Sequence, residues 1–201
     1  EIADRLGVSL SLVPFSSPGE LADAAERDVW DIGLIASEPA RAETIAFSPA
    51  YVEIEATYLV YDDSPLQTVI DVDQPGVRIA VSERSAYDLY LTRNLEHASL
   101  VRAKGLAAAL ELFESEKLDA LAGLRPGLTA DAAKLVGSRI LGGRFTAVQQ
   151  AVGTVVTKQF GADFLSDFIK DARSSGLVER LIDRHGMVGS LLPAGRLRED
   201  S

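Results

Sequence analysis

One arginine stands where an α/β protein could receive an anion. Residues 32–36 form an apolar run typical of a buried strand, and Arg41 follows in a short polar loop. Open α/β sheets bind small ligands outside the carboxyl ends of their strands, and a planar guanidinium suits a carboxylate better than a lysine ammonium does. The spacing therefore predicts capture of a small carboxylate at Arg41. The alternative is a surface arginine that pairs with Glu38 or Glu43.

A second position for an anion surrounds Ser85. Residues 77–81 predict a strand, and Ser85 suits the N-cap of a helix that continues to about residue 95. Free backbone amides and the helix dipole favour an anion at such an N-terminus. We expect Ser85 to contact the ligand and Tyr87 to add a ring to the cleft. A plain helix cap and a packed tyrosine are the alternatives.

Strands and helices alternate along the chain and would position these residues. The repeated order of strand and helix predicts an α/β fold with mostly parallel sheets. Helix, charged turn, aspartate and apolar strand follow one another twice, at residues 27–35 and 116–122, which suggests two lobes built on one plan. Strands are expected at residues 10–13, 31–36, 58–60, 77–81, 99–101, 118–122 and 146–157, and helices at 17–27, 85–95, 106–113, 160–172 and 176–184.

Residues 30–51 and 76–87 resemble the extracellular solute-binding proteins of ABC importers, in the branch that carries polar amino acids. The likeness extends from residue 1 to about residue 190. In that family a strand leads to a loop whose arginine clamps the ligand carboxylate, and an extended segment then climbs to the hinge. The resemblance implies a two-lobed periplasmic binding protein-like fold with two hinge crossovers. Lobe 1 would hold residues 1–55 and 152–201, and lobe 2 would be the inserted residues 56–151.

The resemblance also implies ligand contacts beyond Arg41. Ser37 stands in the arginine loop, which is shorter here than is usual in the family, and Tyr51 ends the extended segment. Arg84 replaces the glycine that usually precedes the helix cap. Because strand side chains alternate between faces, only one of Gln149 and Gln150 can face the cleft, and Gln149 is preferred.

The amino group of an amino acid ligand lacks its usual partner in this sequence. Family members hold that group with an aspartate near position 124, where this chain has Leu124 followed by Arg125. A cation at Arg125 would repel an ammonium group and attract a second carboxylate. We therefore expect an organic acid, or an amino acid held differently, with Arg41 and Arg125 on opposite sides of the cleft. A solvated loop residue is the alternative for Arg125.

The function implied by the resemblance is capture of a solute in the periplasm and delivery to the membrane permease of an ABC importer, by a monomer. Two other classes stay open. Some relatives with this fold are cyclohexadienyl dehydratases, which need a general acid, and Glu38, Glu53 and Glu55 are the candidates near the cleft. Others are the ligand-sensing domains of receptors.

Composition excludes several kinds of function. Thirty acidic against twenty basic residues give a net charge of −10, so the chain lacks the basic footprint of a nucleic-acid-binding protein. There is no cysteine, and the two histidines are isolated, so we expect neither disulfides nor a metal or other cofactor. No apolar run approaches the length of a membrane span.

The two ends of the sequence suggest a fragment and a loose tail. No signal peptide is visible, and residues 1–7 resemble the tail of a helix. We therefore expect that an N-terminal strand and one ligand-contacting loop are missing. The tail after Gly189 is expected to be loose.

Overall fold

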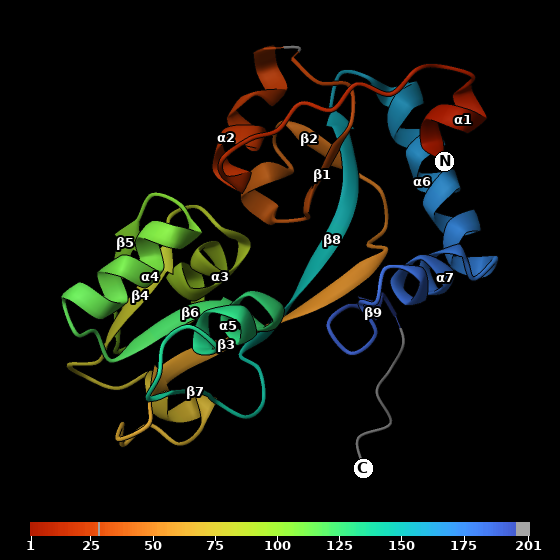
Figure 1. The fold of residues 1–201 in the computed structure, drawn as a ribbon. Coiled ribbons are helices and arrows are strands. Elements are labelled where there is room, and N and C mark those ends of the chain that lie inside the picture. Colours follow the sequence, from red (N-terminus) through yellow and green to blue (C-terminus); the bar gives the residue numbers. More distant parts are fainter. Residues whose placement is uncertain (28, 196–201) are drawn as a thin grey trace.

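Two long strands, β3 (Val52–Tyr61) and β8 (Thr146–Val155), connect the two halves of the computed structural model, which describes residues 1–27 and 29–195. They pair antiparallel along the first half of each strand. Figure 1 shows them crossing from an upper to a lower group of elements. The chain therefore has a two-lobed α/β fold, as the sequence predicts.

The other strands extend this central pair to both sides. They are β1 (Gly33–Ala36), β2 (Ile45–Phe47), β4 (Arg78–Ser82), β5 (Ser99–Ala103), β6 (Ala120–Leu124), β7 (Ser138–Ile140) and β9 (Leu192–Pro193). Among the described residues the main path through the sheet is β1-β8-β3-β6-β4-β5. The expected parallel pairing occurs in the lower lobe, where β4 pairs with β5 and β6. In the upper lobe β1 and β2 pair antiparallel with β8. Strand β8 brings the chain back from the lower lobe, so it runs in the opposite direction to β1 and β2.

Helices cover the sheet in both lobes. They are α1 (Ile2–Leu6), α2 (Pro18–Asp23), α3 (Ala86–Asn94), α4 (Leu106–Ser115), α5 (Arg125–Ala132), α6 (Gln159–Ser174) and α7 (Leu177–Arg184), with short 3₁₀ turns η1 (Ala25–Arg27), η2 (Pro39–Arg41) and η3 (Val69–Val72). Within the described residues, none of the helices is both long and apolar enough to span a membrane. Helix α6 turns one apolar face to the sheet, where Leu165 and Phe168 pack with Val52 of β3 and Val152 of β8.

Serine caps begin the two helices that flank the interlobe space. The hydroxyl of Ser17 accepts a hydrogen bond from the Glu20 amide at 3.2 Å, which confirms the predicted start of α2. The hydroxyl of Ser85 accepts one from the Asp88 amide at 3.1 Å at the start of α3. An N-cap oxygen satisfies an amide that has no partner inside the helix, so the sequence places both helix starts.

The predicted strand at residues 10–13 is wrong. Among the described residues no strand pairs with this segment, and Leu10 and Leu12 are 69% and 81% exposed. A strand is stable only where its backbone groups pair with a neighbour. Without that neighbour, the apolar pattern of this segment does not produce a strand.

The chain also contains elements that the sequence reading missed or placed wrongly. Helix α5 begins at Arg125 and has a proline in its first turn. The sequence analysis predicts no helix here and gives a loop as one alternative for Arg125. The tail after Gly189 was expected to be loose, but in its described part β9 pairs with Val52 and Glu53, and Ala194 is buried. Residues 196–201 of that tail lie outside the described residues. Arg173 on α6 donates to the Ala194 carbonyl at 2.9 Å, which holds this segment against the hinge.

Candidate functional site

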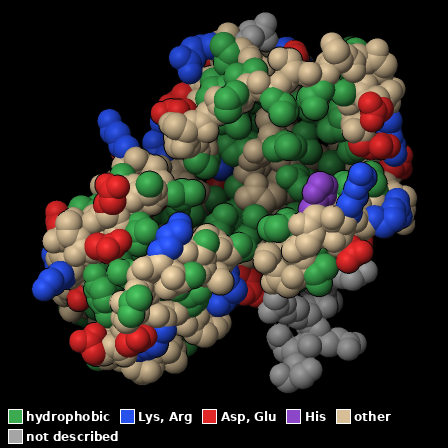
Figure 2. All heavy atoms as spheres, viewed as in Figure 1, with side chains coloured by type: hydrophobic (Ala, Val, Ile, Leu, Met, Phe, Trp, Pro, Cys, Tyr) green, Lys and Arg blue, Asp and Glu red, His purple; other side chains and the backbone are tan. Residues whose placement is uncertain are grey.

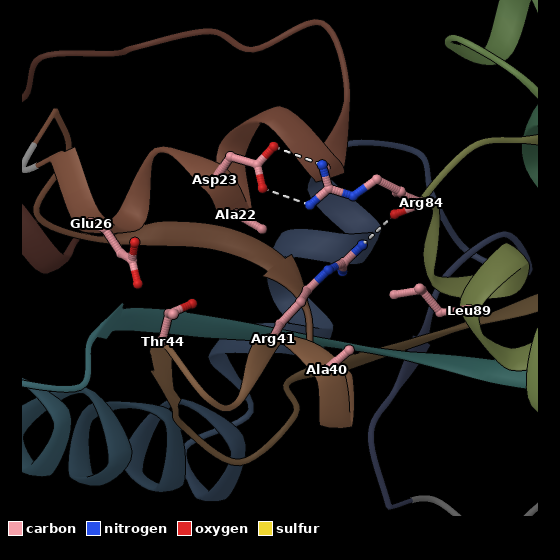
Figure 3. Close-up of a pocket in the computed structure, with 9 residues that line it drawn as sticks. Ala22, Asp23, Glu26, Ala40, Arg41, Thr44, Arg84 and Leu89 are labelled. Atoms are coloured by element: carbon pink, nitrogen blue, oxygen red, sulfur yellow. Dashed lines mark hydrogen bonds and ion pairs between the residues drawn. The ribbon is translucent and has the colours of Figure 1, made fainter.

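Arg41 lies between the lobes, at the end of the turn that follows β1. It is 5% exposed, so it is not the surface arginine of the alternative reading. Its Nη1 donates to the Ala36 carbonyl at 2.9 Å, and its Nη2 donates to the Arg84 carbonyl at 3.0 Å (Figure 3). The guanidinium therefore joins the carboxyl end of β1 in one lobe to the β4–α3 junction in the other.

The charge of Arg41 is retained at neutral pH despite burial. Burial lowers the pKa of its guanidinium to about 10, with Glu38 acting in the opposite direction and Arg84 in the same one. The two carbonyls occupy two of the five N–H donors of a guanidinium. A protonated, buried donor group of this kind is suited to binding an anion, because little water screens the attraction between the two charges.

Side chains from both lobes line a cavity of about 330 Å³ beside Arg41. This volume is at the lower end of the range of small-molecule sites, ~300–1,000 Å³. In Figure 3 Arg41 and Thr44 approach the cavity from one side, and Glu26 and Asp23 approach it from α2 and the turn after it. The lining is completed by Gly19, Ala22, Ala40, Arg84 and Leu89.

Arg84 contributes both its backbone and its side chain to this cavity. Its carbonyl accepts from Arg41, and its guanidinium makes two hydrogen bonds of 2.6 Å to the carboxylate of Asp23. The residue has a φ of 59°, which few non-glycine residues adopt, and its amide donates to Asp88 at 2.7 Å. A Cβ on Gly19 would lie 3.2 Å from the Cβ of Arg84, so glycine there permits the close approach of α2.

Tyr87 lies in a second, smaller cavity. This cavity of about 250 Å³ is lined mainly by apolar side chains from both lobes, among them Leu124, Leu128 and Met187. Figure 2 shows hydrophobic side chains gathered along the recess between the lobes. Burial raises the pKa of the Tyr87 hydroxyl to about 12, so it stays a neutral hydrogen-bonding group. Ser85 is buried at the N-cap of α3, where its hydroxyl accepts a hydrogen bond from the Asp88 amide. In the sequence it lies between Arg84, which lines the larger cavity, and Tyr87, which lines the smaller one.

Arg125 is not placed opposite Arg41 as we expected. Its Nε lies 2.7 Å from a carboxylate oxygen of Glu55 on β3, and its Nη2 donates to the Gly143 carbonyl. It lines neither of the two cavities described above. The correction has a simple cause, since β3 and β6 are neighbouring strands and bring Glu55 within reach of the residue after β6.

The other predicted contact residues are dispersed along the central strands. Ser37 is half-buried and donates its amide to the Gln149 carbonyl at 2.9 Å. The side chain of Gln149 donates to the Ala147 carbonyl at 3.2 Å. Tyr51 packs with the α6–α7 cluster, where burial raises the pKa of its hydroxyl. The larger cavity thus joins Arg41 and Arg84, and it adds Asp23, Glu26 and Thr44, which sequence reasoning missed.

The described residues do not bring a cluster of potential metal ligands together. Among residues 1–27 and 29–195 there is no group of three or more His, Cys, Asp or Glu side chains that could hold a metal ion. The larger cavity is lined by arginines, carboxylates and one hydroxyl, which recognise charged and polar groups.

The architecture is the two-lobed periplasmic binding protein fold, which solved structures of other proteins share. One similar structure, the substrate-binding protein of an amino acid ABC transporter, has a TM-score of 0.76 and 20% identity, covering 91% of this chain and 82% of that one. A binding component of an ABC transporter from Wolinella succinogenes, in complex with lysine, has a TM-score of 0.75 and 20% identity, covering 91% and 81%.

A third similar structure is connected with an enzyme. It is the ancestral amino acid-binding protein AncCDT-1, a precursor of cyclohexadienyl dehydratase, with a TM-score of 0.72 and 21% identity over 91% of this chain and 80% of that one. The sequence matches no protein-family model and no curated protein. The similarity to these structures therefore establishes the fold.

Proposed function

We propose that this protein is the solute-binding component of an ABC importer and captures a small carboxylate-bearing solute, an amino acid or an organic acid, between its lobes. The observation that carries the proposal is the buried guanidinium of Arg41, which reaches a cavity lined by both lobes. A ligand that contacts both lobes favours the closed arrangement. Capture and closure then arise from the same contacts.

The fold supports the remaining parts of this proposal. The similar structures include substrate-binding proteins of ABC transporters, which implies a membrane permease as partner and a location in the periplasm or outside the cell. We place lobe 1 at residues 1–55 with 152–201 and lobe 2 at residues 56–151, because β3 and β8 are the two connections. Binding by a monomer is part of the proposal.

Binding is favoured over catalysis by the contacts that the candidate acids make within the chain. The dehydratase alternative needs a carboxylic acid that can give a proton to the substrate. Glu38 pairs with Arg93 at 2.8 Å, Glu55 pairs with Arg125, and Glu53 accepts from the Gly195 amide at 3.2 Å. Each candidate acid is thus already held by a partner within the chain, and none of the three lines the Arg41 cavity. Turnover of arogenate or prephenate would support the enzyme instead.

The proposal is tested by a thermal-shift screen with amino acids, monocarboxylates and dicarboxylates, followed by calorimetric titration. We expect a carboxylate solute to raise Tm, and Arg41→Ala to weaken its binding at least tenfold because a charged hydrogen-bond partner is lost. Arg41→Lys should restore only part of the affinity. The exposed Arg180, which donates to the Ser175 carbonyl, provides the matched control as Arg180→Ala. Equal affinity in Arg41→Ala and Arg180→Ala would refute the role of Arg41.

A further inference from the structure

Among the described residues, two ion pairs join the first lobe to residues 84–94, which form α3 and its approach. One joins Asp23 of α2 to Arg84, and the other joins Glu38, at the start of the Arg41 turn, to Arg93 near the end of α3. In the second pair, Nη2 of Arg93 lies 2.8 Å from Oε2 of Glu38. Asp23 and Arg84 line the Arg41 cavity, whereas Glu38 and Arg93 do not. The second pair therefore links the lobes at a distance from the solute.

Glu38 is connected to Arg41 through the backbone. Its carbonyl accepts hydrogen bonds from the amides of Arg41 at 2.9 Å and Ala42 at 3.2 Å, so it forms the first residue of the turn that presents the guanidinium. Its side chain is only 12% exposed, against 43% for Arg93. The same residue thus fixes the turn with its backbone and fixes the turn to α3 with its carboxylate.

Helix α3 is consequently held to the Arg41 turn at both of its ends. Arg41 donates to the Arg84 carbonyl just before the helix, and Glu38 binds Arg93 close to its last residue, Asn94. Two separated contacts define an orientation, whereas one contact leaves the helix free to pivot. Both contacts join one lobe to the other, so a rotation of the lobes away from each other would break them.

We propose that Glu38 and Arg93 are a positioning pair, which forms on lobe closure and holds the Arg41 turn against α3 without touching the solute. A contact made only in the closed arrangement raises the closed population, and a ligand that needs that arrangement then binds more tightly. The effect on affinity rests on the proposed function, but the effect on closure does not.

The test measures the distance between the lobes directly. The chain has no cysteine, so spin labels can be placed on introduced cysteines at the exposed Lys170 of α6 and Lys104, which precedes α4. Pulsed dipolar spectroscopy without added solute should show a shorter-distance population in the wild type. In Glu38→Gln and in Arg93→Gln that population should fall about fivefold relative to the longer distances, as expected for the loss of one partly exposed ion pair.

A double-mutant cycle separates a pair from two independent effects. Because the two side chains act together, the double variant Glu38→Gln/Arg93→Gln should be no more open than either single variant. Neutral substitutions are used because a cation at position 38 would repel Arg41. Arg5→Gln breaks exposed pairs with Glu1 and Asp171 inside lobe 1 and serves as control, with an unchanged distance distribution.

The affinities for succinate and L-lysine give a second readout. If either probe binds the wild type, the three variants of the cycle should each bind it about fivefold more weakly, with no further loss in the double variant. If neither probe binds, that result counts against the proposed function and leaves the distance measurement as the test of the pair. Distances in Glu38→Gln and Arg93→Gln that match the wild type, or that change additively, would overturn the proposal.

Discussion

At the scale of single residues, the proposed solute site is built on arginines whose charges are offset by the chain itself. Arg41 is buried against two carbonyls, and Arg84 is paired with Asp23. A buried cation needs such compensation, because desolvation otherwise costs more than its attraction to a ligand returns. The ligand must therefore add to contacts that already exist, or replace Asp23 on Arg84.

The Asp23–Arg84 pair makes a contribution to stability that depends on pH. Its hydrogen bonds to Arg84 lower the pKa of the Asp23 carboxyl below its usual 3.8. A lowered folded-state pKa stabilises the fold above the unfolded pKa, and this stabilisation is lost as pH falls through the folded value. Both side chains are about half exposed, so we expect Asp23→Asn to cost at most about 1 kcal/mol at pH 6.

Urea denaturation of the wild type and Asp23→Asn between pH 2.5 and 6 measures this contribution. The difference between their free energies of unfolding should be largest at pH 6, should begin to fall near the unfolded pKa of about 3.8, and should vanish only below the lowered folded pKa. Asp167→Asn, which breaks an exposed pair with Lys170 inside α6, is the control. A difference that grows on acidification would contradict the assignment.

Sequence reasoning found the arginines of this site but not their partners. Arg41 and Arg84 follow strands, where the alternation of elements predicts ligand contacts. Asp23 carries no comparable signal, because it lies on an amphipathic helix and meets Arg84 only when the two lobes come together. For Arg125 the position after a strand predicts a ligand contact, but its partner in the structure is Glu55 on the neighbouring strand β3.

At the scale of elements, the structure depends on a close packing of β1 and β2 against β8. Gly153 of β8 is paired with Gly33 of β1 on one side and with Phe47 of β2 on the other. A Cβ at this glycine would lie 2.4 Å from a methyl carbon of Ile45 and 3.3 Å from the ring of Phe47. The two strands that precede and follow the Arg41 turn therefore rely on the absence of a side chain here.

We predict that Gly153→Ala destabilises the protein by about 1–3 kcal/mol, the usual cost of overpacking a filled core. Gly127→Ala is the matched control, because Gly127 lies in α5 and a Cβ there meets no atom within 4 Å. Alanine in a helix is favoured over glycine, so the control should be neutral or stabilising by up to about 1 kcal/mol. Chemical denaturation monitored by circular dichroism measures both variants, and equal stabilities would show that Ile45 can move aside without cost.

Element types were predictable where the apolar period was long or a cap was present, as in α3, α6 and β8. The failures have a different origin. Residues 10–13 have the composition of a strand but no partner among the described residues, and β9 has only two residues and exists because β3 offers an edge. Pairing between distant segments decides both cases, and it is not encoded in local composition.

At the scale of the whole molecule, β3 and β8 determine how the lobes can move. They are the connections that join the lobes, and they pair with each other along the first half of each strand, so the lobes are expected to rotate about this ribbon. The polar contacts of Arg41, Asp23 and Glu38 with the α3 segment lie across the interlobe space and would open with that rotation. The proposed function therefore predicts that solute binding and domain closure are coupled through α3.

This coupling predicts that a bound solute makes the molecule more compact. A solute that contacts both lobes shifts the population toward closure by no more than its difference in affinity for the two arrangements. Small-angle X-ray scattering should show a smaller radius of gyration on saturation with any probe that raises Tm in the solute screen, in the wild type. Arg41→Ala, at probe concentrations that saturate it, should contract less, because the guanidinium contacts both lobes.

Arg180→Ala should contract like the wild type. A radius of gyration that is unchanged by a tightly bound probe would mean that the solute is held by one lobe alone, and the link between capture and closure would have to be abandoned.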